Sequence, residues 1–74
     1  MGDHKGFTVV LRGYDTGEVD AMLKRIKGAL ASADPATRAS VRAELDHPVF
    51  HVRLRGYNRI EVDDYLRKAV DRLA

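Results

Sequence analysis

The sequence predicts an α+β fold in which two short strands form an antiparallel ribbon packed on helices. Three observations lead to this prediction. A strand–turn–helix motif occurs twice, the apolar residues of its first part alternate with other residues, and those of its last part recur at helical spacing. A chain of 74 residues is long enough for one small domain. We therefore expect a single domain over residues 1–74, and an all-helical fold with extended, unpaired arms is the alternative.

The chain contains two related segments, residues 7–31 and 50–74, and each opens with the motif F-x-V-x-L-R-G-Y-[D/N]-x-x-E-V-D-x-x-L. The two copies agree at every residue that the motif names, apart from the Asp/Asn exchange, and both end in Leu-Ala. Two copies on one chain predict an intramolecular pair related by a pseudo-two-fold axis, which is the covalent counterpart of a homodimer. A homodimer of the whole chain is a further option.

Each copy opens with a predicted strand, at residues 7–11 and 50–54. Phenylalanine, valine and leucine occupy every second position there, which is the period of a strand with one buried face. On this alternation Leu11 and Leu54 share a face with the phenylalanines, which favours packing in the core or at the strand ends. Since a single strand leaves its backbone groups unpaired, we expect the two strands to pair antiparallel; a parallel pair or a swapped dimer is the alternative.

A turn follows each predicted strand. Gly13 and Gly56 are expected to break the strands, either in a tight turn or with a positive φ, which glycine adopts without steric cost. The next residues, Tyr14 and Tyr57, are expected to be structural, with the ring packed and the hydroxyl hydrogen-bonded.

Each turn leads into a predicted helix that begins with a capping box. Asp15 and Asn58 are favoured N-cap residues, whose side chains accept a hydrogen bond from a first-turn N–H. Glu18 and Glu61 stand three positions later and are expected to reach back to the backbone N–H of the cap. Apolar residues then recur at helical spacing, which predicts two amphipathic helices.

Another helix is predicted between the copies, from about residue 35 to residue 46. Asp34 is a good N-cap, Pro35 suits the first helical position, and Pro48 ends the helix. Its candidates for burial are Ala39, Val41 and Leu45. The core that the two copies share is expected to contain Phe7, Val9, Val19, Leu23, Ile26, Phe50, Val52, Val62, Leu66 and Val70.

The composition narrows the class of protein. The chain has no cysteine, so disulfides do not stabilise it and nothing indicates a secreted scaffold. No apolar run approaches the roughly 20 residues that span a bilayer, and the first residues are no signal peptide. We therefore expect a cytoplasmic protein. A net charge of +2 permits a weak attraction to anionic lipid or nucleic acid.

Neither catalysis nor metal binding is expected. The capping boxes account for Glu18 and Glu61, and no nucleophile accompanies the carboxylates. His47 and His51 have the spacing of helical metal ligands, but Pro48 stands between them and no third ligand is near. No cofactor and no small-molecule substrate are expected.

A family resemblance rests on residues 11–15 (L-R-G-Y-D) and 18–20 (E-V-D), and on residues 54–58 (L-R-G-Y-N) and 61–63 (E-V-D). These segments resemble the DivIVA domain of bacterial cell-division and polar-growth scaffolds. The string R-G-Y-[D/N]-x-x-E-V-[D/N] is moderately specific, and its presence in both copies strengthens the resemblance, which covers most of the chain apart from the middle helix.

The resemblance implies a non-catalytic scaffold or adaptor that dimerises, recruits other proteins and works in the cytoplasm or at the inner face of the cell membrane. It also implies contact with the membrane through an apolar residue beside the arginine of R-G-Y. By position these are Leu11 with Arg12 and Leu54 with Arg55, and Arg53 extends them to a small basic patch. Core packing of the leucines and local pairing of the arginines with acidic residues are the alternatives.

Two further functions are consistent with the residues. A two-stranded ribbon fits the major groove of DNA, so a small nucleic-acid-binding module is one alternative, although acidic residues are interleaved and no groove-reading motif appears. Its phosphate contacts would come from Arg12, Lys24, Arg25, Lys27, Arg53, Arg55 and Arg59. The other alternative is a protein adaptor that never touches lipid and binds a partner helix on an exposed apolar stripe.

Overall fold

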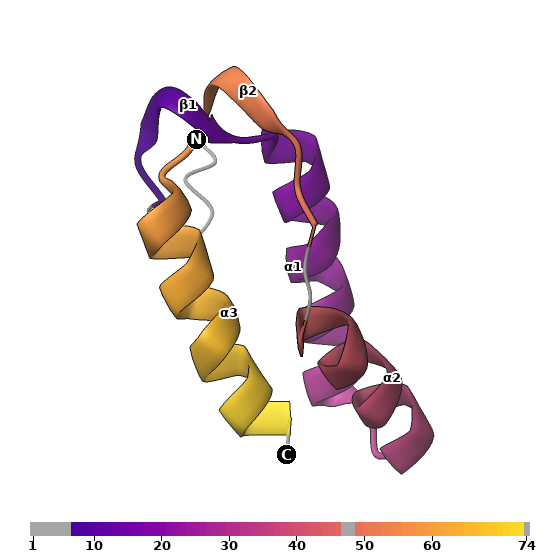
Figure 1. Cartoon of the computed structure of the whole chain (residues 1–74). Helices are drawn as coiled ribbons and strands as arrows, with labels where there is room; N and C mark the ends of the chain where they lie inside the picture. Colours follow the sequence, from indigo (N-terminus) through magenta and orange to yellow (C-terminus); the bar gives the residue numbers. More distant parts are fainter. Residues whose placement is uncertain (1–6, 47–48, 74) are drawn as a thin grey trace.

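The two strands lie together at one end of the molecule, next to the first turns of two helices (Figure 1). The computed structural model describes residues 7–46 and 49–73. Within them the elements follow in the order β1 (Val9–Tyr14), α1 (Thr16–Ala31), α2 (Pro35–Asp46), β2 (Val52–Tyr57) and α3 (Arg59–Leu73). The predicted α+β class is therefore confirmed, and so is a middle helix over residues 35–46.

Helices α1 and α3 both start at the ribbon and run away from it, while α2 leads back from the end of α1 towards β2 (Figure 1). Local capping fixes where they start. The side chains of Asp15 and Asn58 accept hydrogen bonds from the N–H three residues later, at 3.0 and 3.1 Å. Asp34 accepts one from the N–H of Ala36 at 3.0 Å. The predicted helix stop at Pro48 falls outside the described residues.

The core lies between the three helices, each of which contacts the other two. One apolar stripe from each helix supplies most of it. Its buried members are Val19, Leu23, Ile26, Ala29, Val41, Leu45, Tyr57, Val62, Leu66, Ala69 and Leu73. Phe7, Phe50 and Val70, which were expected in the core, are partly buried and pack against it.

Three residues predicted for the core are exposed. Val9 and Val52 are 54% and 48% exposed, and Ala39 on α2 also faces solvent. For α2, Val41 and Leu45 alone fill the stripe that faces the other helices, which leaves Ala39 on an outer side. For the strands, burial is confined to their last residues, so alternation along the first part of a strand does not mark a buried face here.

The strands pair antiparallel, as predicted. Val9 lies opposite Tyr57, Leu11 opposite Arg55, and Tyr14 opposite Val52, so the numbers rise along β1 as they fall along β2. The register is irregular at each step. Contrary to the prediction, the glycines do not end the strands. Strand β1 continues through Gly13 to Tyr14, and β2 continues through Gly56 to Tyr57.

Candidate functional site

The ribbon exposes two leucines beside two arginines. Leu11 and Leu54 are 70% and 75% exposed, and the neighbouring Arg12 and Arg55 are exposed as well. We call these four residues the ribbon tip. The prediction that the leucines pack in the core is therefore wrong. The chain leaves the core after each phenylalanine and returns to it only at the following glycine, which carries the leucines out into solvent.

The arginines of the ribbon tip differ in their partners from Arg53, which lies beside the tip. Arg53 Nε donates to Asp15 Oδ2 at 2.9 Å, so this arginine is paired with the cap of α1. Within the described ranges 7–46 and 49–73, neither Arg12 nor Arg55 has a carboxylate within ion-pair distance. Local pairing, the alternative considered for Arg12 and Arg55, is thus not found among the described residues, whereas Arg53, expected in the basic patch, is paired.

Arg12 has an unusual backbone conformation. Its φ is 60°, the one positive value among the non-glycine residues that the structure describes. Side chains other than glycine, asparagine and aspartate rarely adopt this left-handed region, because Cβ approaches the following carbonyl. The residue that bends the first R-G-Y segment is therefore the arginine, and not the glycine after it.

The glycines have a different role from the one predicted, because neither has a φ in the left-handed region and each lies where the two backbones are in close contact. A Cβ on Gly13 would lie 2.2 Å from the carbonyl carbon of Gly56. A Cβ on Gly56 would lie 2.2 Å from the carbonyl oxygen of Tyr14. Since both obstacles are backbone atoms, only glycine fits at these two positions.

The glutamates of the predicted capping boxes tie the ribbon to the helices instead of reaching back to their own caps. Glu18 accepts hydrogen bonds from the backbone N–H of His51 at 2.7 Å and contacts its ring Nδ1 at 2.7 Å. Glu61 accepts from the backbone N–H of Thr8 at 2.7 Å and from its hydroxyl at 3.1 Å. The cap N–H groups are already occupied, because Asp15 donates to the carbonyl of His51 at 2.8 Å.

The tyrosines make a second set of ties. The hydroxyl of Tyr57 donates to Asp20 at 3.0 Å and that of Tyr14 to Asp63 at 2.9 Å, so each strand is bonded to the helix of the other copy. Tyr57 is buried and Tyr14 half-buried. Burial, and then the hydrogen bond to Asp63, raise the pKa of Tyr14. The tyrosine rings also pack against the phenylalanines in a tilted arrangement, with centroids 5.4 Å apart for Phe7–Tyr57 and 5.1 Å apart for Tyr14–Phe50.

The ribbon is attached to α1 and to α3, and the groups that bond to the two helices differ in their charge. On α1 the ribbon is held by His51 against Glu18 and by Arg53 against Asp15. On α3 the bonds to Glu61 come from a neutral side chain, and the cap is the uncharged Asn58. The hydrogen bond from the Arg53 guanidinium lowers the pKa of Asp15. The hydrogen bond from the His51 backbone N–H, followed by the contact with its ring, lowers the pKa of Glu18.

These lowered pKa values predict that acid weakens the attachment of the ribbon to α1. A carboxyl whose pKa is lower in the folded than in the unfolded state stabilises the fold above the unfolded value, and this contribution is lost as the pH falls. We expect the urea midpoint to drop as the pH falls from about 5 through the usual carboxyl range near 4. The Asp15→Asn/Glu18→Gln variant should be less stable than wild type at neutral pH and have a shallower dependence on pH. Equal slopes for both proteins would contradict the assignment.

Other kinds of site find less support in the geometry. The part of the chain that the structure describes holds no group of three or more His, Cys, Asp or Glu side chains placed to bind a metal ion. His47 lies outside the described residues. The cations proposed for phosphate binding are divided among the ribbon, the start of α3 and helix α1, where Arg25 pairs with Glu44 of α2. None of the described helices is both long and apolar enough to cross a membrane.

Sequence reasoning missed the hydrogen bonds that join each copy to the helix of the other copy. The pattern D/N-x-x-E satisfied a local rule, so it gave no reason to look for a partner far along the chain. The signal that was present is the repetition itself, since the same glutamate, tyrosine and aspartate occur in both copies.

Comparisons of the chain with models of protein families, with curated proteins and with solved structures give no match.

Proposed function

We propose that the chain is a non-catalytic, DivIVA-like binding module that attaches through its ribbon tip to an anionic membrane surface. The surface is the inner face of the cell membrane, and the module serves there as an adaptor for other proteins in bacterial division or growth. One observation carries the proposal. Leu11 and Leu54 are exposed at the same end of the molecule, beside Arg12 and Arg55, whose charges no described carboxylate neutralises. Apolar side chains next to free cations are what a peripheral site for anionic lipid requires.

The proposal includes a pseudo-two-fold pairing of the two copies. It is supported by contacts that occur at equivalent positions in both: the glutamate bonds to the residue before the strand of the other copy, the tyrosine bonds to the opposite helix, and the Phe–Tyr ring contacts. A pairing of this kind brings both leucine–arginine sets to one end. The module would then carry two insertion points on a single chain, where the covalent pair replaces a homodimer.

The expected binding is weak and reversible. Burying a leucine contributes about 1.5–3 kcal/mol, and a cation near an anionic surface contributes about 1 kcal/mol. Two of each give roughly 5–8 kcal/mol, which corresponds to a dissociation constant between about 0.2 mM and 1 µM before ordering costs. Neither the leucines nor the arginines suffice alone, so removing either pair should abolish detectable binding.

Co-sedimentation with vesicles tests the proposal. Wild type should pellet with phosphatidylglycerol vesicles and remain in solution with phosphatidylcholine vesicles. Leu11→Asp/Leu54→Asp should stay folded by circular dichroism, because both side chains are exposed, and should lose binding. Ala36→Asp/Ala43→Asp on the exposed surface of α2 adds the same charge away from the tip and should still bind. Wild type that remains in solution with anionic vesicles would sink the membrane proposal.

Arg12→Gly separates folding from binding. Glycine adopts φ 60° without strain, so the variant should be at least as stable as wild type and yet bind anionic vesicles more weakly. Arg55→Gly is the matched control, because its backbone has no positive φ and glycine in a strand lowers stability.

Tight, salt-sensitive binding of wild type to duplex DNA, with none to vesicles, would instead favour the nucleic-acid-binding alternative.

A further inference from the structure

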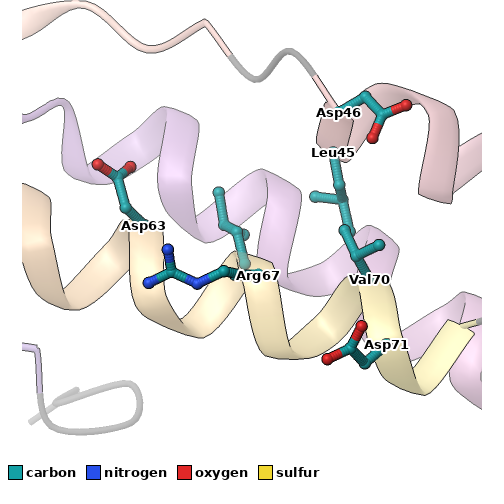
Figure 2. Close-up of a pocket in the computed structure, with 7 residues that line it drawn as sticks. Leu45, Asp46, Asp63, Arg67, Val70 and Asp71 are labelled. Carbon is teal, nitrogen blue, oxygen red and sulfur yellow. The ribbon is translucent and has the colours of Figure 1, made fainter.

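An acidic groove lies between α2 and α3, away from the ribbon tip. It measures about 350 Å³, and its floor is formed by Leu45, Leu66 and Val70. Leu45 and Val70 lie next to each other, with Asp46 on one side and Asp71 on the other (Figure 2). Asp63 extends the rim along α3. We call this feature, with its three aspartates, the acidic groove.

The charge of the groove is not balanced from within. Asp46 and Asp71 have no cation at ion-pair distance in the part of the chain that the structure describes. Asp63 accepts a hydrogen bond from a tyrosine hydroxyl, which leaves its charge in place. Arg67, the one cation among the residues that line the groove, shares the Asp64 carboxylate outside it with Lys68, and the three aspartates of the rim outnumber it.

A complementary surface lies on α2. Pro35, Arg38, Ala39 and Arg42 stand at helical spacing, and together they line one wall of a second groove of about 320 Å³. We call these four residues the arginine stripe. Pro35, Ala39 and Arg42 are exposed, and Arg42 has no carboxylate partner among the described residues. Arg38 donates to the carbonyl of Arg72 at 3.1 Å and keeps its charge.

The two surfaces match in charge, in size and in the bulk of their side chains. The stripe from Pro35 to Arg42 is about 10 Å long, and the groove from Asp63 to Asp71 about 12 Å, at 1.5 Å per helical residue. The small side chains of Pro35 and Ala39 allow α2 to approach the apolar floor closely. Two arginines one turn apart would then face the aspartates of the rim.

We propose that the acidic groove of one copy receives the arginine stripe of a second copy. The two surfaces share no residue, so each copy offers one donor and one acceptor surface. A heterologous contact of this kind builds open chains of copies unless the rotation closes a ring. The contact leaves the ribbon tip free, so a chain of copies would present several tips at once and strengthen a weak surface attachment. Self-association itself does not depend on the proposed membrane function.

Sedimentation velocity in solution, without lipid, tests this proposal. The weight-average mass of wild type should rise with concentration at low salt and return to that of one chain near 1 M salt, where the Debye length is about 3 Å. Asp46→Lys/Asp71→Lys and Arg38→Glu/Arg42→Glu should each remain single chains, with self-association at least about tenfold weaker. Lys24→Glu/Lys27→Glu, on an exposed face of α1, reverses two charges outside both surfaces and should associate like wild type.

The decisive experiment mixes the variant that has the reversed groove with the variant that has the reversed stripe. The stripe of the first fits the unchanged groove of the second, and the reversed stripe of the second fits the reversed groove of the first, so the mixture should associate again. Restored association in the mixture supports the proposal even if each variant is slightly destabilised. The proposal is overturned if wild type stays a single chain at every concentration at low salt. It is equally overturned if the variants associate like wild type, or if the mixture remains dissociated.

Discussion

Replacing Gly13 or Gly56 with alanine is expected to unfold the protein or nearly so. Each new methyl group would meet backbone atoms at 2.2 Å, which side-chain rearrangement cannot relieve. Overpacking in less crowded places already costs about 1–3 kcal/mol, and the strands would have to separate here. A chain of this length has a total stability of roughly 4–11 kcal/mol, so either substitution removes much of it.

Gly28→Ala is the matched control for this prediction. Gly28 lies inside α1, and a Cβ there would meet nothing within 4 Å. Alanine is favoured over glycine in a helix by about 1 kcal/mol, so this variant should be more stable than wild type. Urea unfolding followed by circular dichroism measures all three variants. A Gly13→Ala midpoint equal to that of wild type would show that the strands do not pass as closely as described.

Ile26→Ala is expected to have the second largest effect, a loss of about 2–5 kcal/mol. Ile26 is 1% exposed and sits in the middle of the stripe that α1 contributes to the core. Because the three helices share this one small core, the surrounding side chains have little room to close the cavity that alanine leaves.

The chain supplies its own control in Ile60, which is 80% exposed at the start of α3. Ile60→Ala removes the same atoms from a side chain that is mostly in water, so its stability should stay within about 0.5 kcal/mol of wild type. The pair of variants is compared by the same urea titration. Similar losses for both would mean that Ile26 is not the centre of the core.

Local rules predicted most of the fold. Asp15, Asp34 and Asn58 start the three helices where capping preferences place them, and helical spacing found Val19, Ile26 and Val62, the largest of the fully buried side chains. The antiparallel pairing followed from the need to satisfy backbone groups. Each of these inferences uses residues close together in sequence, or a requirement that any chain must meet.

The site was harder to predict, because it depends on where the strands lie relative to the helices. Alternation places Leu11 and Leu54 on one face but does not say whether anything covers that face. Glu18 fitted a capping box, and only the fold brings the backbone of His51 within its reach. Nothing in the sequence indicates the positive φ of Arg12, because the glycine that follows it is the residue for which a positive φ is expected.

The ribbon is held to α1 partly by an ion pair and to α3 by hydrogen bonds from uncharged groups, and this difference has a consequence for how such a domain can change over time. In a symmetric assembly of identical chains every substitution appears twice, so both halves of an interface must tolerate it together. Here β1 and β2 are separate stretches of one polypeptide, and a single codon change alters one attachment while the other stays intact. Each half of the ribbon is therefore free to acquire its own sensitivity to salt and acid, and the strands remain paired at any dilution of the protein.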